Sequence, residues 1–331
     1  MGIVKTGIVL LIGSFWGSIV LLRSIFLIFT DRAKFLAFRV RETPPSCLSD
    51  NDIWKHDSIK LKDVKIHYVS AGDPNKPLML FLHGFPEFWF SWRYQLREFC
   101  KDYRCIAIDM RGFGDSDKPS GMHHYEMGKL TTDVKDVIEG LGYKACTLVA
   151  HDWGAAVAWS FAYEHADLVD KLIILNVPHS RARHDNFSFK QFLASWYIMF
   201  FQLPYLPEWY MRRGDQMIFN WLFNKPPSGR EGMVTPEEIE AWKYQFSQPG
   251  AWTSAINYYR ANIRTDRKQW GKITKPTLII WGVRDIALTE LLCDGSVKYC
   301  EDVIVKKLDA THWVMQDKPD EVNKCMREFL A

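Results

Sequence analysis

The chain has 331 residues, among them 42 Lys or Arg and 39 Asp or Glu, so its formal net charge at pH 7 is +3. With 47% hydrophobic and 24% charged residues, its composition is that of an ordinary globular protein, which excludes a disordered, collagen-like or strongly charged chain. A charge this close to neutrality gives no reason to expect nucleic acid as a partner. The seven cysteines form no C-x-x-C pair, so neither a disulfide scaffold nor a structural zinc site is predicted.

Residues 1–30 are predicted to hold a membrane anchor. Residues 6–22 carry no charge, and after Arg23 the apolar run resumes as far as Phe29. At about 1.5 Å per residue, a helix through Phe29 is long enough for a bilayer core of about 30 Å, provided that Arg23 reaches an edge. A cleaved signal peptide would have a shorter apolar region, and a buried helix is rarely apolar all round at the end of a chain. We therefore expect one membrane crossing over residues 6–29.

The orientation of this anchor is predicted from the charges around it. Four basic residues follow the apolar segment within positions 32–41, whereas only Lys5 and the terminal amine precede it. The positive-inside rule favours a catalytic part that faces the cytosol, although one extra basic residue near the start would reverse this. Asn186 begins an N-x-S sequon, which arises easily by chance, so both its glycosylation and the orientation stay open.

After a polar linker, expected at residues 31–55, short apolar runs alternate with helical stretches. The runs are PLMLFL (77–82), RCIAI (104–108), TLVA (147–150), KLIIL (171–175) and PTLIIW (276–281). This alternation indicates an α/β fold with a buried, mostly parallel sheet and crossover helices. Between about residues 181 and 263 the pattern changes to amphipathic helices rich in Trp, Tyr, Phe and Pro. We therefore predict a core in two parts, residues 56–180 and 264–331, interrupted by a helical cap at residues 181–263.

One strand-to-helix turn has the residues of a nucleophile elbow. TLVA leads into His151-Asp152-Trp153-Gly154, and a helical pattern follows. Small residues around one polar residue are what such a turn needs, because its backbone is strained and neighbouring backbones pass close to it. Serine is the usual central residue, and here it is Asp152. Taken alone, the segment fits a helix N-cap equally well, since Asp is among the preferred N-cap residues.

A second turn strengthens the interpretation as an elbow. His83-Gly84-Phe85-Pro86 follows PLMLFL directly, which places the backbone N–H of Phe85 at the top of the sheet. Together with the N–H of Trp153 it would form an oxyanion hole. Gly and Pro mark turns anywhere, but the position after a buried strand favours this role. The glycine-rich stretch after RCIAI lacks the third glycine of a dinucleotide fingerprint, so NAD binding is excluded.

The acid and the base of a triad are expected at later strand ends, in that order. Asp285 follows PTLIIWG, and His312 follows the next predicted strand, a short apolar run at residues 303–305. Other histidines compete for the role of base, namely His123, His124, His151 and His179. The loop position after a late strand favours His312.

The chain resembles the α/β-hydrolase fold epoxide hydrolases of the soluble type, which use an Asp nucleophile. The resemblance rests on HGFPEFWFSWR (83–93), DMRGFGDSDKP (109–119), HDWGA (151–155), VRDIAL (283–288) and THWVMQDKP (311–319). It extends from about residue 53 to the end of the chain. The N-terminal anchor is similar to that of membrane-bound members, which implies the endoplasmic reticulum as the location.

The resemblance also implies residues in the cap. Epoxide hydrolases of this type carry two cap tyrosines that hold and protonate the epoxide oxygen. SWYIMFFQLP matches the first segment and implies Tyr197, while NYYR matches the second and implies Tyr259. A slip of one residue would exchange Tyr258 for Tyr259, and either tyrosine would otherwise only line an aromatic cleft. The substrate-binding residues implied are Trp153, Trp89 and Tyr258.

These residues predict the hydrolysis of an epoxide to a vicinal diol. Asp152 would form an ester with the substrate, His312 oriented by Asp285 would activate water, and no metal or organic cofactor would be needed. The aromatic cap and the anchor favour a lipophilic epoxide, and a fatty-acid epoxide fits. A haloalkane or haloacetate dehalogenase would keep the same triad, and a catalytically silent, membrane-tethered binding protein is a third alternative. The particular epoxide and the oligomeric state stay open.

Overall fold

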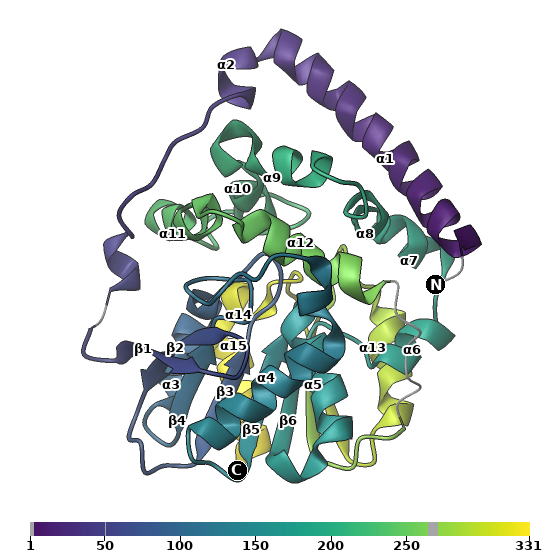
Figure 1. The fold of residues 1–331 in the computed structure, drawn as a ribbon. Helices are drawn as coiled ribbons and strands as arrows, with labels where there is room; N and C mark the ends of the chain where they lie inside the picture. Colours follow the sequence, from purple (N-terminus) through teal and green to yellow (C-terminus); the bar gives the residue numbers. More distant parts are fainter. Residues whose placement is uncertain (1–2, 50, 264–270) are drawn as a thin grey trace.

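The computed structural model describes residues 3–49, 51–263 and 271–331. A central sheet has helices on both faces, a helical cap covers one end of it, and a long N-terminal helix runs along the cap (Figure 1). The expected start of the second part of the core, at residues 264–270, lies outside the described residues.

The sheet has eight strands in the order β1-β2-β4-β3-β5-β6-β7-β8. The β1–β2 and β2–β4 pairs are antiparallel, and the remaining pairs are parallel. The α/β class and the mostly parallel sheet are thereby confirmed. The strands are β1 (Trp54–Lys60), β2 (Lys65–Ala71), β3 (Leu78–Leu82), β4 (Arg104–Ile108), β5 (Cys146–His151), β6 (Val169–Leu175), β7 (Thr277–Gly282) and β8 (Val303–Leu308).

The burial of the central strands explains why continuous apolar runs in the sequence predict the sheet. Every residue of β3, β5 and β7 is buried, because helices cover both faces of a parallel sheet. In the edge strand β1 only Trp54 is buried, and its polar sequence WKHDSIK contains no apolar run; the strand begins inside the expected linker. The helices and 3₁₀ turns of the core are η2 (Trp89–Trp92), α3 (Arg93–Phe99), η3 (Met122–Tyr125), α4 (Met127–Gly140), α5 (Asp152–Glu164), η4 (Ala166–Leu168), α13 (Glu290–Ser296), η5 (Val297–Tyr299), α14 (Val314–Asp317) and α15 (Pro319–Leu330).

The cap is inserted between β6 and β7 and lies over the carboxyl ends of the parallel strands (Figure 1). Its helices are α6 (Ser180–Asp185), α7 (Phe189–Ala194), α8 (Trp196–Phe200), α9 (Leu206–Gln216), α10 (Ile218–Asn224), α11 (Pro236–Ser247) and α12 (Ala251–Asn262). Thr235 and Glu238 form a capping box at the start of α11, and Pro236 follows at the first helical position. The core of the cap consists of packed aromatic rings. For example, the ring centroids of Phe246 and Trp252 are 4.5 Å apart.

The N-terminal part of the chain comprises α1 (Ile3–Thr30), α2 (Arg32–Phe35) and η1 (Ser46–Leu48). Residues Thr6–Thr30 have a mean hydropathy of 2.0, and in the part of the chain that the structure describes they form the one helix long and apolar enough to cross a membrane. Figure 1 shows α1 lying along the cap near α7 and α8.

The segment between α2 and β1 is held against the cap by a buried arginine. Arg41 is 9% exposed and forms ion pairs with Asp215 at 2.6 Å and with Glu240 at 2.8 Å. The backbone N–H of Arg39 donates to the same Asp215 carboxylate at 3.0 Å. These contacts come from α9 and α11, so the segment joins the N-terminal helices to the cap.

Replacement of Arg41 by Met is therefore expected to lower the free energy of unfolding by about 2 kcal/mol. Loss of one partner of a fully buried pair typically costs roughly 3–5 kcal/mol, and the half-exposed partners of Arg41 reduce this cost. Urea denaturation of the full chain in detergent measures the change. Arg39→Met is the matched control, because the Arg39 side chain is exposed. An equal loss in both variants would contradict the prediction.

Candidate active site

Asp152 occupies a strained turn between β5 and α5. Its φ is +47°, in the left-handed region that residues other than glycine rarely adopt. Added to Gly154, a Cβ atom would lie 2.3 Å from the Leu82 carbonyl oxygen, and added to Gly84 it would lie 2.3 Å from the Cβ of Asp152. Both positions require glycine because the ends of β3 and β5 meet here. The N-cap of α5 is His151 rather than Asp152, so this geometry is that of an elbow.

The carboxylate of Asp152 is held by backbone and histidine contacts. The Phe85 N–H donates to Asp152 Oδ1 at 2.6 Å, and His312 Nε2 lies 3.6 Å from Asp152 Oδ2. The N–H of Trp153 lies in the first turn of α5, where N–H groups have no acceptor within the helix. Burial raises the pKa of Asp152, but His312, His151 and the Phe85 N–H outweigh burial and lower it below its ordinary value. The carboxylate is therefore ionised at neutral pH.

His312 is oriented by a carboxylate that is itself fixed. Its Nδ1 lies 2.6 Å from Asp285 Oδ2, which also accepts from Asn176 Nδ2 at 2.8 Å. The other oxygen of Asp285 accepts the backbone N–H groups of Ala287 and Leu288 at 2.7 and 2.9 Å. Burial lowers the pKa of His312, but the carboxylates of Asp285 and Asp152 outweigh burial and raise it to about 10. In the resting site His312 is accordingly protonated.

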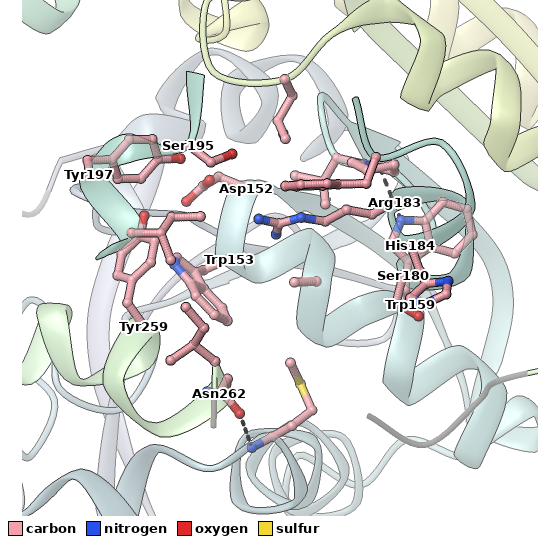
Figure 2. A pocket seen from close by; sticks show the side chains of 18 of the residues that line it. Asp152, Trp153, Trp159, Ser180, Arg183, His184, Ser195, Tyr197, Tyr259 and Asn262 are labelled. Carbon is pink, nitrogen blue, oxygen red and sulfur yellow. Dashed lines mark hydrogen bonds between the residues drawn. The ribbon is translucent and has the colours of Figure 1, made fainter. Parts of the chain in front are cut away.

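Two tyrosines of the cap face this carboxylate across a cavity of about 650 Å³ (Figure 2). Tyr197 comes from α8 and Tyr259 from α12, and their ring centroids are 5.8 Å apart with an angle of 82° between the planes. Asp152 and Trp153 line the same cavity. Burial raises the pKa of both tyrosines above the ordinary value, so both hydroxyls keep their protons and remain hydrogen-bond donors.

Tyr258 does not line this cavity, contrary to the prediction that it binds substrate. Its hydroxyl donates to the carbonyl oxygen of Arg111 at 2.7 Å, and its ring packs against Phe113 at 5.0 Å. Neighbouring residues of a helix point about 100° apart, so α12 directs Tyr259 into the cavity and Tyr258 into the core. Tyr258 therefore has a packing role.

Trp89 also lies away from the cavity, so the structure does not bring it together with the other residues predicted to bind substrate. It is fully buried in η2, where its ring packs against Trp54 at 5.5 Å and His56 at 5.3 Å. It lines a separate, smaller cavity of about 230 Å³. An aromatic residue in a family-like segment indicates that the segment is close to the site, but it does not indicate the direction of the side chain.

Sequence reasoning missed a buried Glu–His hydrogen bond and a basic residue at the site. Glu87 Oε2 lies 2.8 Å from His151 Nδ1, and His151 Nε2 lies 2.9 Å from the backbone oxygen of His312, so this pair supports the loop that carries His312. Arg183, on α6, lines the cavity. The segment NVPHSRARH follows the apolar run KLIIL directly, and this position at a carboxyl strand end was the available signal for Arg183.

Across residues 3–49, 51–263 and 271–331, no group of three or more His, Cys, Asp or Glu is arranged to hold a metal ion.

The coupling between His312 and its carboxylates predicts a pH dependence. Because the pKa of His312 is raised on folding, its stabilising contribution is complete below about pH 6.5, the ordinary value, and is lost as the pH rises through about 10. In Asp152→Asn the pKa of His312 is expected to fall, since one of the two carboxylates is lost. NMR titration of the His312 ring in both proteins measures the shift, and an unchanged pKa would rule out the coupling.

Comparison with known proteins agrees with this geometry. Residues 77–319 match the alpha/beta hydrolase fold family. Human "Epoxide hydrolase 4" is 41% identical over 303 residues, covering 88% of this chain and 83% of that protein. "Epoxide hydrolase 1" of Caenorhabditis elegans is 43% identical over 314 residues, covering 92% of this chain and 77% of that protein. The crystal structure of Bacillus megaterium epoxide hydrolase with an inhibitor has a TM-score of 0.77 and 36% identity, covering 83% of this chain and 99% of that one. The chain belongs to the epoxide hydrolases of the α/β-hydrolase fold.

Proposed function

We propose that this epoxide hydrolase converts a lipophilic epoxide into a vicinal diol through a covalent ester on Asp152. The observation that carries the proposal is the ionised carboxylate of Asp152, which lies in one cavity with the hydroxyls of Tyr197 and Tyr259. A strained epoxide carbon is opened by a nucleophile that is already ionised, without a general base. A serine would form an ether at the same carbon, whereas a carboxylate forms an ester that water cleaves.

In the first step an oxygen of Asp152 attacks one ring carbon, and the bond from that carbon to the epoxide oxygen breaks. The departing oxygen takes a proton from one cap tyrosine while the other tyrosine donates a hydrogen bond. Ester formation removes the negative charge of Asp152, which lowers the pKa of His312. His312 then gives its proton to the tyrosinate, which leaves the imidazole neutral.

In the second step the neutral imidazole of His312 takes a proton from water as the water oxygen attacks the carbonyl carbon of the ester. The N–H groups of Phe85 and Trp153 stabilise the oxyanion that forms. Collapse of this intermediate expels the diol oxygen, which takes the proton of the new carboxylic acid. The products are the diol, the Asp152 carboxylate and protonated His312, which is the resting pair.

The walls of the cavity favour a lipophilic substrate. Most of the residues that line it are apolar or aromatic, among them Trp159, Phe192 and Ile198. A fatty-acid epoxide has the matching chemistry, with a long apolar chain around one reactive ring. A dehalogenase would need hydrogen-bond donors to a halide in place of the tyrosine hydroxyls. A catalytically silent binding protein would not require His312 to be oriented by Asp285 toward Asp152. Both alternatives are therefore disfavoured.

A membrane is proposed as the setting, with α1 as the attachment. The length and hydropathy of Thr6–Thr30 support this, and the similarity to membrane-bound members points to the endoplasmic reticulum. If α1 crosses the membrane, the basic residues that follow it support a catalytic part on the cytosolic side.

A His312→Gln variant is expected to accumulate the ester, because the second step loses its base. Exposure of the full chain in detergent to a fatty-acid epoxide should raise its intact mass by the whole mass of the epoxide. The double variant Asp152→Asn, His312→Gln is the control and should show no gain. A mass gain from a haloalkane alone, equal to the mass of the haloalkane minus that of the hydrogen halide, would instead identify a dehalogenase. No adduct from any of several epoxides would overturn the covalent mechanism.

A further inference from the structure

One charged side chain in the cavity has no role in the proposed mechanism. Arg183 is half-buried on α6, and Figure 2 shows its guanidinium directed toward the middle of the cavity, in the region of Asp152 and Trp153. Apolar and aromatic side chains form much of the surrounding wall, among them Trp159, Phe192 and Ile198. An arginine keeps its charge at any physiological pH.

Within the described parts of the chain, the guanidinium of Arg183 forms no hydrogen bond or ion pair. The cavity contains three carboxylates, Asp152, Glu126 and Glu164, and none of them lies at ion-pair distance from the guanidinium. Asp152 is occupied by Phe85 and His312, and Glu164 accepts from the Thr131 hydroxyl at 3.3 Å. The charge of Arg183 is therefore available to an anion that enters the cavity.

The charge of Arg183 acts on the reaction centre. Burial raises the pKa of Tyr197 and of Tyr259, and Arg183 opposes this rise at both hydroxyls. A ligand anion beside Arg183 would therefore lie in the same electrostatic environment as the epoxide. An anionic substrate would also be repelled by ionised Asp152, and a cation between the two anions would reduce that repulsion.

We propose that Arg183 binds the carboxylate of the substrate, so that the enzyme acts on lipophilic epoxides that carry a free carboxylic acid. The fork of the guanidinium matches a carboxylate through two parallel hydrogen bonds. A single cation balances a single negative charge, which favours a carboxylate over a phosphate dianion. The apolar walls then cover the hydrocarbon chain. This inference rests on the proposed function and adds the group that selects acids.

The test compares an epoxy fatty acid with its methyl ester, which differ only in the charge that Arg183 would recognise. In Arg183→Met, the ratio of kcat/KM for the acid to kcat/KM for the ester is expected to fall by about 10- to 100-fold, the effect of one charge-assisted contact. Arg183→Lys should retain part of the preference, since it keeps the charge without the fork. Arg181→Met is the matched control, because Arg181 lies on the same helix and is exposed.

An equal loss for acid and ester would overturn the carboxylate site and leave the proposed function standing. Failure of the wild-type protein to hydrolyse either compound would overturn the proposed function and this inference together. A second readout does not need catalysis. A saturated C18 fatty acid should compete with the ester in the wild-type protein, and its inhibition constant should rise at least tenfold in Arg183→Met.

A second inference concerns α1 and rests on different contacts. Its buried residues recur every three or four positions, at Gly13, Gly17, Val20 and Ser24, which defines one face along the middle of the helix. This face lies against the cap. A Cβ atom on Gly13 would lie 2.6 Å from the carbonyl oxygen of Met199, so the two backbones are in close approach.

Further contacts fix α1 on α8 and on the turn after it. A Cβ atom on Gly17 would lie 2.5 Å from the side chain of Leu203, and the rings of Trp16 and Trp196 are 5.6 Å apart. These contacts involve the middle of α1, which would lie at the bilayer centre if the helix crossed the membrane. The cap would then enter the hydrocarbon together with the Glu208–Arg260 ion pair that joins α9 to α12, at a large cost.

The opposite face of α1 has the character of a lipid-facing surface. Its most exposed side chains are Phe29, Leu11, Leu22, Phe26 and Phe15, with exposed fractions from 62% to 85%. From position 3 to position 30 there is no acidic residue. Such a face is stable in lipid and costly in water.

We infer that α1 lies in the plane of the membrane interface, with one face on the cap and the other in lipid, instead of crossing the bilayer as its length and hydropathy predict. The helix α8 lies between α1 and the substrate cavity, since Tyr197, Ile198 and Met199 of α8 line that cavity. The cavity is therefore held next to the lipid from which a lipophilic epoxide would enter.

Photo-crosslinking of the full chain in phosphatidylcholine–phosphatidylserine vesicles tests this arrangement. Benzoylphenylalanine at position 15 should form lipid adducts, whereas at position 16 it should link to the α8 peptide. Lipid adducts at both positions without a link to α8 would show a crossing helix and overturn the inference. Absence of lipid adducts at position 15 would overturn it as well. Hydrolysis is assayed separately, so an inactive protein does not affect this result.

Discussion

The close approach of two strand ends is the constraint on which the site depends. Where β3 and β5 leave the sheet, their backbones come so near that Gly84 and Gly154 have no space for a side chain. The chain turns through a left-handed residue at this point, and that residue is Asp152. The strain has a chemical consequence, because it directs the carboxylate away from its own helix and onto the N–H of Phe85. A relaxed turn would leave Asp152 as a helix cap.

Electrostatic coupling connects the two halves of the proposed reaction. In the resting site the charge of Asp152 helps to keep His312 protonated, so the nucleophile is ionised and the base is inactive. Esterification removes that charge, and the same histidine becomes able to accept a proton. The order of the two steps would thus follow from one pair of groups 3.6 Å apart, without movement of either. Asp285 holds the imidazole in place throughout, since both of its oxygens are already occupied by other donors.

The parts of the fold that sequence alone predicts are those with a local signal. Continuous apolar runs predict the buried strands, and polar residues directly after them predict Asp152, Asp285 and His312, because carboxyl ends of parallel strands meet at one edge. β1 carries no such run and was missed. The directions of the Trp89 and Tyr258 side chains have no local signal either. Each lies in the expected segment, but a backbone turn or a helical rotation of about 100° decides which way the ring points.

Arg183 shows the limit of local signals most clearly. A second arginine lies two positions before it, and only the folded chain separates the arginine that enters the cavity from Arg181 on the outside. The same holds for α1, whose composition is that of a membrane span, while its two buried glycines reveal a face fitted to α8. Arg41 extends this connection by pairing with α9 and α11, so the N-terminal segment and the cap pack as one unit. Because α1 packs against α8, which carries Tyr197, the position of α1 is part of the geometry that places this tyrosine at the site.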